Sequence, residues 1–263
     1  MDLGITDRVA LVAGASEGIG FGAALCLARE GARVVVASRD RARIETAAQS
    51  IRSETGGEAV GVVVDVTEPD CGERLVAAGR AAFGDPSILV TNAGGPAGGF
   101  YDSLQPLDFE AAVNLSFMSV VRLTHAALPA MRAAKWGRIV HISSATVIEP
   151  NPDLFLSSTV RPAVAGFSKS LAREMAPEGV TSNLVCPGYV ATERLNELAD
   201  RRARNDGSSR EEALDAMAAT VPMGRLATEA ELGDAVAFLC SERAAYITGI
   251  ALRVDGGKVN FML

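Results

Sequence analysis

The sequence predicts an α/β fold, a single domain built on a doubly wound parallel sheet of about seven strands with helices on both faces. Short, β-branched, apolar segments alternate with longer amphipathic segments along nearly the whole chain. The short segments are apolar on both sides, as expected for parallel strands that are covered on both faces. No Pro/Gly/Ser-rich linker, charge block or repeat divides the 263 residues, so one domain over residues 1–263 is expected.

The expected elements follow one another in strict alternation. The strands are expected at residues 9–13, 33–37, 59–64, 88–91, 138–142, 181–185 and 251–254. The helices are expected at residues 22–30, 41–55, 72–83, 108–134, 163–176 and 229–239. Such a series implies right-handed crossovers, and its ligands bind beyond the carboxyl ends of the strands, where the strand order reverses. Every motif described below falls at such an end, which places the candidate site there.

Composition and charge exclude several functions. The net charge of −7, with basic residues that are scattered or interleaved with acids, argues against a nucleic-acid surface. No run reaches the roughly 18 apolar residues of a membrane span, and the apolar run at 9–13 is too short for a signal core. The cysteines form no Cys-x-x-Cys pair and are expected as buried free thiols; they are Cys26, Cys71, Cys186 and Cys240. We therefore expect a cytoplasmic protein with a small-molecule substrate and no metal site.

A glycine-rich turn follows the first expected strand directly and opens a helix. It reads Gly14-Ala15-Ser16-Glu17-Gly18-Ile19-Gly20. Glycines allow a tight turn and a close approach of the backbone to a pyrophosphate, while the helix N-terminus supplies N–H groups and partial positive charge. A tight turn that binds nothing is the alternative. The position at the start of a strand–helix–strand series favours dinucleotide binding.

The Gly-x-x-x-Gly-x-Gly spacing and the motifs that follow it in order resemble the short-chain dehydrogenase/reductase family. The matching motifs are Asp65-Val66, Asn92-Ala93-Gly94, Asn114, and Pro187-Gly188 with Thr192. The resemblance covers roughly residues 5–258 and implies a Rossmann-like domain that binds a nicotinamide cofactor. The cofactor-binding residues that it implies are Gly14, Ser16, Glu17, Gly18, Ile19, Gly20, Ser38, Arg39, Asp65, Val66, Asn92, Ala93, Gly94, Arg161, Pro187, Gly188, Val190 and Thr192.

The end of the second strand indicates which cofactor is bound. An acid there would bind the adenosine 2′-hydroxyl and repel a 2′-phosphate. This chain has Ser38-Arg39 instead, a hydroxyl donor and a guanidinium suited to phosphate. We therefore expect NADP(H), with NAD(H) as the alternative, because Glu17 acts against a 2′-phosphate and Arg39 could be a solvated loop charge.

The catalytic motif departs from the pattern of the family. The resemblance implies that Ser144 polarises a substrate oxygen and that Asn114 holds a water, but the usual Tyr-x-x-x-Lys is replaced by Ser157-x-x-x-Arg161. None of the three tyrosines is followed four residues later by lysine, so no such pair exists anywhere in the chain. The resemblance is closest in general type to the 3-oxoacyl carrier-protein reductases, as a divergent member that lacks this pair.

The substitution changes the expected chemistry. Arg161 keeps a permanent cation for ribose binding, but the hydroxyl of Ser157 is far less acidic than a phenol and is a poor general acid near neutral pH. Pro162 is expected to begin or kink the helix, which would disturb the alignment of the pair. Tyr189, at the rim of the site, and a water held by Asn114 are the other candidate donors. His141 is expected in the core and Glu149 in solvent, and a role as proton donor is the alternative for each.

Three functions remain open. The first is an NADP(H)-dependent oxidoreductase acting on a carbonyl/alcohol pair, with a 3-oxoacyl type of substrate as a candidate and an atypical proton donor. The second is a catalytically impaired homologue that binds nicotinamide cofactor in a regulatory or structural role. The third is a non-redox use of the pocket on an acyl or sugar ligand. The amphipathic stretch 193–220 is expected to form a helical substrate lid, and the helices at 108–134 and 163–176 resemble those that pair in homodimers and homotetramers of the family.

Overall fold

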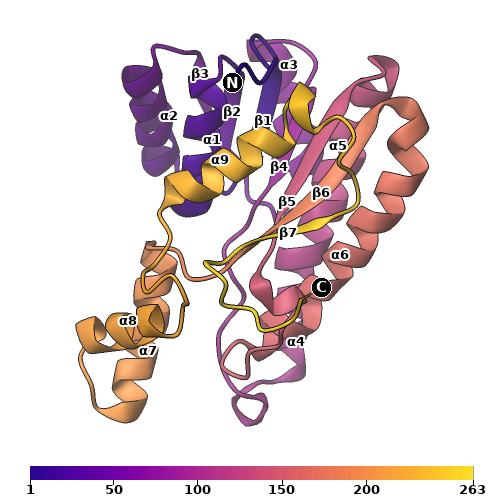
Figure 1. Cartoon of the computed structure of the whole chain (residues 1–263). Helices are drawn as coiled ribbons and strands as arrows, with labels where there is room; N and C mark the ends of the chain where they lie inside the picture. Colours follow the sequence, from indigo (N-terminus) through magenta and orange to yellow (C-terminus); the bar gives the residue numbers. More distant parts are fainter. Residues whose placement is uncertain (263) are drawn as a thin grey trace.

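Seven parallel strands form the centre of the protein, in the order β3-β2-β1-β4-β5-β6-β7 (Figure 1). The computed structural model describes residues 1–262. The strands are β1 Val9–Ala13, β2 Arg33–Ser38, β3 Ala59–Val63, β4 Ile88–Thr91, β5 Gly137–Ile142, β6 Val180–Pro187 and β7 Ala251–Val254. The order reverses between β1 and β4, so a ligand site is expected where these two strands end. The predicted doubly wound, seven-stranded sheet is confirmed.

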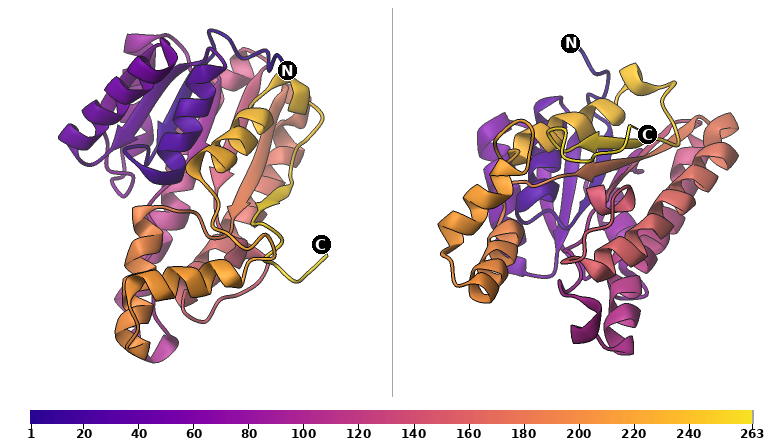
Figure 2. Two further views of the ribbon diagram at one scale, coloured as in Figure 1. Left: turned by 60° about the vertical axis from the view of Figure 1, so that its left-hand side comes forward. Right: turned by 60° about the horizontal axis from the view of Figure 1, so that its bottom comes forward.

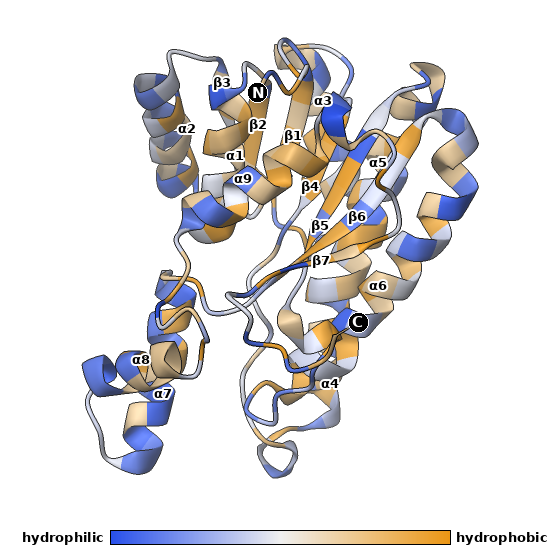
Figure 3. Ribbon diagram, in the orientation of Figure 1, coloured by the Kyte–Doolittle hydropathy of each residue, from blue (hydrophilic) through white to orange (hydrophobic). Residues whose placement is uncertain are grey.

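Two layers of helices cover the sheet (Figures 1 and 2). One layer holds α1 Gly18–Arg29, α2 Arg41–Thr55 and α9 Glu229–Leu239, and the other holds α3 Cys71–Ala82, α5 Ser119–Ala133 and α6 Phe155–Met175. A separate apolar cluster lies on each face of the sheet. Figure 3 shows the strands as mostly hydrophobic and the outer faces of the helices as mixed or hydrophilic. This is the pattern of strands that are buried on both sides.

The long helix expected at 108–134 is interrupted by a wide turn. It divides into α4 Pro106–Val113, a π-helical turn at Asn114–Met118, and α5. The whole stretch Pro106–Ala133 is long and apolar enough to cross a membrane by length and composition alone. In this fold, however, Leu123, Ala127 and Met131 are buried against the sheet, and this packing accounts for the apolar composition. Single π-turns are often found next to functional sites.

The helix α6 corrects an expectation about Pro162. It begins at Phe155, eight residues earlier than expected, and continues through the proline. Leu156 and Val160 are buried in a cluster with Ala112 from α4, and this packing holds the first two turns in helical form. Pro162 itself lies on the exposed side of the helix. Because α6 is continuous, Ser157 and Arg161 lie one turn apart on the same side.

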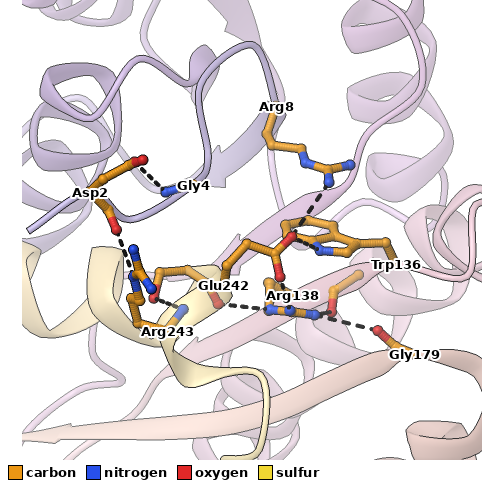
Figure 4. Close-up of polar contacts among 10 residues, drawn as sticks. Asp2, Gly4, Arg8, Trp136, Arg138, Gly179, Glu242 and Arg243 are labelled. Carbon is orange, nitrogen blue, oxygen red and sulfur yellow. Dashed lines mark hydrogen bonds and ion pairs between the residues drawn. The ribbon is translucent and has the colours of Figure 1, made fainter.

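At the amino end of the sheet, a buried arginine is fully surrounded by partners (Figure 4). Arg138, at the start of β5, is only 3% exposed and lies 4.3 Å from the ring centre of Trp136. Arg8 lies over the same ring at 3.9 Å. Glu242 pairs with Arg138 at 3.5 Å and accepts a 2.7 Å hydrogen bond from the indole of Trp136. Burial lowers the pKa of Arg138, and the carboxylate of Glu242 opposes that shift.

Two helices, α7 Glu193–Asp206 and α8 Arg210–Ala219, extend beyond the carboxyl end of the sheet (Figure 1). The two helices share a small hydrophobic core, separate from those of the sheet, which contains Leu195, Leu198, Ala199, Ala213 and Met217. The hydroxyl of Thr192 caps α7, Ser209 and Glu212 form a capping box on α8, and Gly207 ends α7 in the left-handed conformation. The expected pair of helices within 193–220 is therefore present, and it stands next to the carboxyl ends of the strands.

Candidate active site

A cavity of about 930 Å³ lies at the carboxyl ends of the strands. This volume is near the upper end of the range that is common for ligand pockets. All the predicted cofactor residues except Gly20 line it, as do Ser144, Ser157, Arg161 and Tyr189 among the predicted catalytic residues. Gly20 lies behind the lining, where a Cβ atom would collide with the carbonyl oxygen of Gly14. Its role is therefore to let α1 pack closely on the glycine turn.

The glycine turn holds backbone N–H groups toward the cavity. Gly14 and Gly18 have φ values of +59° and +65°, a conformation that favours glycine. The helix α1 begins at Gly18, after the N-cap residue Glu17, whose carboxylate is paired with Arg43, so its amino end still directs partial positive charge at the turn. The amide of Asn92 donates a 2.8 Å hydrogen bond to the carbonyl oxygen of Gly14 and holds the turn in place. These features fit the pyrophosphate of a dinucleotide.

The end of β2 provides cations for a further phosphate. Ser38 and Arg39 line the cavity as predicted, and Arg43 from α2 lines it beside them. Arg43 forms an ion pair with Glu17. The acid that argued against a 2′-phosphate is therefore neutralised within the fold, and Arg39 forms no ion pair with any residue that the structure describes. This edge of the cavity fits the 2′-phosphate of NADP(H) better than a free 2′-hydroxyl.

Asp65 lies at the other side of the adenosine end. Its carboxylate accepts hydrogen bonds from the backbone N–H of Thr67 at 2.9 Å and from its hydroxyl at 2.7 Å. Partial burial acts to raise the pKa of Asp65, but the hydrogen bonds from Thr67 and the charge of Arg39 outweigh it and lower the pKa. The carboxylate is thus ionised near neutral pH and fixed in one orientation.

Four hydroxyl groups gather where β5 ends. The side chain of Ser144 accepts a 3.1 Å hydrogen bond from the backbone N–H of Thr146, which leaves its hydroxyl hydrogen free to donate. The hydroxyls of Thr146 and Ser157 lie 3.1 Å apart, and both residues are buried. Ser143 is 7% exposed, yet its hydroxyl has no hydrogen-bond partner among residues 1–262. Buried polar groups are rarely left without a partner, so this group points to a bound ligand.

Arg161 is a cation without an acidic partner in the described part of the chain. Its guanidinium donates one long hydrogen bond, 3.4 Å, to the carbonyl oxygen of Ile142. Burial lowers the pKa of Arg161 to about 10, and the nearby charge of Arg194 acts in the same direction. The group still carries its charge at neutral pH. A half-buried cation with most of its donors unused is suited to bind hydroxyls or an anion from a ligand.

Asn114 does not face the cavity. Its amide nitrogen donates to the carbonyl oxygen of Thr67 at 3.2 Å, and its amide oxygen accepts from Arg122 at 2.8 Å. Asn114 is also absent from the cavity lining, although its neighbour Leu115 is part of it. Asn114 is the first residue of the π-helical turn, and its side chain contacts the β3–α3 connection at Thr67. The water-holding role of Asn114 stays a prediction, and its side chain is hydrogen-bonded to Thr67 and Arg122.

The other candidate donors occupy different surroundings. His141 is fully buried, between the hydroxyls of Thr91 at 2.8 Å and Ser182 at 3.3 Å, and burial lowers its pKa to about 3. It does not line the cavity, as the sequence led us to expect of a core histidine. Glu149 lines the rim, where hydrogen bonds from Asn260 and the charge of Lys258 lower its pKa. Tyr189 lines the cavity and accepts a 3.3 Å hydrogen bond from Arg202.

Arginines of α7 bind the two-helix segment to two loops beside the cavity. Arg194 donates to the carbonyl oxygen of Pro96 at 2.7 Å, and Arg201 donates to that of Asp153 at 2.8 Å. Arg202 forms an ion pair with the carboxylate of Asp153 at 2.8 Å. The guanidinium of Arg201 also lies against Gly98, where no room is left for a side chain. The loop after β4 and the loop before α6 are therefore both tied to α7.

Known proteins similar to this chain belong to one family of oxidoreductases. A family model described as enoyl-(acyl carrier protein) reductase matches residues 14–258. The 3-oxoacyl-[acyl-carrier-protein] reductase FabG of Escherichia coli strain K12 is 36% identical over 250 residues, which are 95% of this chain and 96% of that protein. The chain therefore belongs to the short-chain dehydrogenase/reductase family.

Solved structures of NADPH complexes are also similar to this chain. The L-sorbose reductase of Gluconobacter frateurii, complexed with NADPH and L-sorbose, superimposes with a TM-score of 0.94 at 33% identity, over 100% of both chains. A variant of actinorhodin polyketide ketoreductase with NADPH gives a TM-score of 0.92 at 37% identity, over 97% of this chain and 98% of that one. The prediction of NADP(H) as the cofactor agrees with these relatives and with the cations at the end of β2.

Sequence reasoning missed several residues of the cavity. Arg43, Thr146, Arg194, Arg202 and Lys258 all line it. Thr146 stands two residues after Ser144, and Lys258 follows the last strand after two glycines, so the rule that ligands bind beyond strand ends could have found both. Nothing in the local sequence indicates that Arg43 reaches Glu17 or that the arginines of α7 reach the loops opposite.

Proposed function

We propose that this protein is an NADP(H)-dependent oxidoreductase that interconverts a carbonyl compound and its alcohol. The observation that carries the proposal is one cavity that holds both a complete dinucleotide cradle and Ser144 with its hydroxyl hydrogen free. NADPH bound in the cradle supplies the hydride. A 3-oxoacyl compound is the substrate type that the similarity to FabG favours.

The residues near Ser144 supply orientation and charge. The Ser144 hydroxyl, held by the N–H of Thr146, donates a hydrogen bond to the substrate carbonyl oxygen and stabilises the negative charge that develops there. Arg161 holds the ribose hydroxyls and adds positive charge to the same region. Ser143, which has no protein partner in the described residues, provides a further donor to a bound molecule.

In this proposal the proton comes from bulk solvent, relayed by a bound water that takes up one proton as it passes another to the substrate oxygen, and no phenol takes part. Ser157 and Thr146 satisfy each other, and neither hydroxyl is acidic enough to act as an efficient general acid at neutral pH. The short side chain of Ser157 leaves space for a water molecule where a tyrosine ring would stand. Such a water would lie between these hydroxyls and Arg161. Tyr189 is the competing donor, because its hydroxyl belongs to the same cavity.

The test combines binding with turnover. NADPH binding is measured by fluorescence, and oxidation of NADPH is followed against a panel of ketones, 3-oxoacyl thioesters and ketoses. We expect binding and turnover in the parent protein, loss of turnover with retained binding in Ser144→Ala, and most of the activity retained in Tyr189→Phe. A large loss in Tyr189→Phe would identify Tyr189 as the donor instead of water.

A second candidate function is a cofactor-binding homologue that does not turn over. Its support is the absence of a phenol next to Ser144 together with the orientation of Asn114 toward Thr67 and Arg122. Tight NADPH binding, with no NADPH oxidised in the presence of any compound of the panel, would establish this second function. A gain of rate in the double variant Ser157→Tyr, Arg161→Lys would then show that the scaffold still positions a substrate for hydride transfer.

We also propose that the protein assembles as a homodimer or homotetramer. Leu107 is 73% exposed and Val113 is 40% exposed on α4, next to the long helices whose counterparts pair in the family. Covering such apolar side chains favours association. Light scattering coupled to size exclusion tests this, and a monomer at micromolar concentration would contradict it.

A further inference from the structure

The substrate end of the cavity contains more cations than acids. Apart from the residues around the adenosine, the charged lining residues are Glu149, Arg161, Glu193, Arg194, Arg202 and Lys258. The two acids are already occupied: Glu149 accepts from Asn260 at 3.0 and 3.1 Å, and Glu193 accepts from Asn196 at 3.0 Å. Arg194 and Arg202 form ion pairs with acids outside this set, so among these cations Arg161 and Lys258 form no ion pair within residues 1–262.

Of Arg194, Arg202 and Lys258, Lys258 is the one that forms no ion pair among residues 1–262. Arg194 pairs with Glu197 at 3.0 Å, and Arg202 pairs with Asp153 at 2.8 Å. Lys258 has no carboxylate within 4.0 Å in residues 1–262. Its ammonium group has a single hydrogen-bond acceptor, the hydroxyl of Thr220, at 3.3 Å. Two of its three N–H donors are thus available to a ligand.

The surrounding backbone holds Lys258 in this position. After β7, Gly256 and Gly257 adopt φ values of +64° and +85° and turn the chain back toward the cavity. The carboxylate of Asp255 accepts from the backbone N–H groups of Gly257 at 3.0 Å and Val259 at 2.9 Å, which fixes the turn. Lys258 is half-buried. The cation is therefore oriented by the fold and does not belong to a freely solvated loop.

Tyr189 lines the same cavity as Ser144 and lies beside Lys258. The ammonium nitrogen of Lys258 lies 4.7 Å from the ring centre of Tyr189, and the guanidinium of Arg202 lies 5.9 Å from the same centre. Two cations near one ring repel each other, and a negative group placed between them removes that repulsion. Tyr189 follows Pro187-Gly188, at the nicotinamide end of the cavity.

We propose that Lys258, with Tyr189 and Thr220, binds a singly charged oxyanion of the substrate, so that the preferred substrate carries an anionic group in addition to its reacting carbonyl. A carboxylate of a free oxo acid and the phosphodiester of a carrier arm have this chemistry in common. The inference rests on the proposed function for its kinetic form, but binding of the anion does not require turnover. Lys258 acts here as a specificity-determining residue.

The experiment compares matched neutral and anionic compounds. One arm uses 5-oxohexanoate and its methyl ester, and the other uses acetoacetyl-pantetheine and its 4′-phosphate methyl ester. We expect kcat/KM to favour the anionic member of one pair by about tenfold to a hundredfold, the usual effect of one charge-assisted hydrogen bond. Whichever pair shows the preference identifies the source of the oxyanion.

Variants of Lys258 then locate the preference. We expect Lys258→Met to remove it by lowering kcat/KM for the anionic compounds only, and Lys258→Arg to retain most of it. Lys135→Met is the matched control, because Lys135 lies at the opposite end of the sheet and pairs with Glu178. An equal loss on both members of a pair in Lys258→Met, or no preference in the parent protein, would overturn the inference.

Equilibrium binding separates this inference from the proposed function. The protein saturated with NADP⁺ is titrated by calorimetry with hexanoate and with hexanamide, and with methyl phosphate diesters in a second series. Tighter binding of an anion, lost in Lys258→Met, supports the site even if no compound is turned over. Turnover without any preference for an anion would support the enzyme and reject the anion site.

Discussion

The two ends of the sheet each hold an arginine taken partly or wholly out of water, and their surroundings differ sharply. At the amino end, Arg138 stacks on Trp136 and pairs with Glu242 (Figure 4). At the carboxyl end, Arg161 has one long hydrogen bond to a carbonyl oxygen and, within residues 1–262, no carboxylate partner. A buried charge that is fully paired serves the fold, whereas one with unused donors needs a ligand. We therefore assign Arg138 to stability and Arg161 to ligand binding.

The largest effect is expected from breaking the paired end. Replacing Arg138 by Met removes a 97% buried cation and leaves the carbonyl oxygen of Ser241 and the carboxylate of Glu242 without this donor. We expect the free energy of unfolding to fall by about 3 kcal/mol in urea denaturation. NADPH affinity should be unchanged. Arg225→Met, which breaks an exposed pair with Glu231, is the control and should cost less than about 1 kcal/mol.

At the opposite end, Ser144→Ala should change activity far more than stability. Its hydroxyl is the donor that faces the developing negative charge, and removal of one such donor typically costs about a hundredfold in kcat. NADPH titrations should match those of the parent protein, and the free energy of unfolding should fall by about 1 kcal/mol, because the N–H of Thr146 loses its acceptor. Ser170→Ala, at an exposed position of α6, is the control. A normal rate in Ser144→Ala would remove this residue from the proposed mechanism.

Between the two ends, β5 also carries His141, which is neutral in the folded protein. Burial lowers its pKa to about 3, below its ordinary value near 6.5. The unfolded chain therefore binds the proton first, and stability that is complete above pH 6.5 declines as the pH falls toward 3. At pH 5 the loss from this group should be about 2 kcal/mol.

This pH dependence is measured by comparing the unfolding free energy at pH 7 and pH 5. His141→Asn should be less stable at both values, because it loses hydrogen bonds to Thr91 and Ser182, but its loss between the two should be smaller by about 2 kcal/mol. His125→Asn, at an exposed position of α5, should keep the slope of the parent protein. An unchanged slope in His141→Asn would contradict the assignment.

At the adenosine end of the cavity, Arg39 and Arg43 allow a test of whether an unpaired cation binds the cofactor. Arg39 forms no ion pair in the described residues, while Arg43 already pairs with Glu17. We expect Arg39→Ala to weaken NADPH binding about tenfold and to leave NADH binding nearly unchanged, because only NADPH carries the 2′-phosphate. The ratio of the two dissociation constants is the readout. An equal loss for both cofactors would place Arg39 elsewhere on the nucleotide.

The smallest effect on stability is expected from replacing Arg161, the counterpart of Arg138 that forms no ion pair within residues 1–262. Arg161→Met removes a cation that no described carboxylate neutralises, so the protein without cofactor should keep its stability or gain up to about 1 kcal/mol. NADPH affinity should nevertheless fall about fivefold, in keeping with the loss of a ribose contact. A destabilisation as large as that of Arg138→Met would show that Arg161 serves the fold after all.

Much of the fold follows from local sequence patterns, and the errors have identifiable causes. The seven strands and the glycine turn are evident from apolar runs and strand–turn–helix order, which depend on neighbours in sequence. The break expected at Pro162 is wrong because contacts of Leu156 and Val160 with α4 stabilise the first turns of α6. The π-turn at Asn114 has no signature in the sequence and changes where that side chain points.

The site shows the same division between local and distant information. Residues that follow a strand directly, such as Asp65, Asn92 and Ser144, could be placed in the cavity from the sequence. Arg43 and Lys258 could not be given their roles, since the role of each depends on which charges lie nearby in space. The pairing of Arg43 with Glu17 and the absence of an ion pair at Lys258 within residues 1–262 are results of packing alone.

The seat of Arg201 against Gly98 has a consequence for how this site can vary among related proteins. Any side chain at position 98 would occupy the space of the guanidinium, which also reaches the carbonyl oxygen of Asp153. The two positions should therefore change together: homologues with alanine or a larger residue at 98 should carry a shorter side chain at 201. Glycine is then required at position 98 because the guanidinium of Arg201 fills the space of a side chain, and not because the backbone must be flexible there.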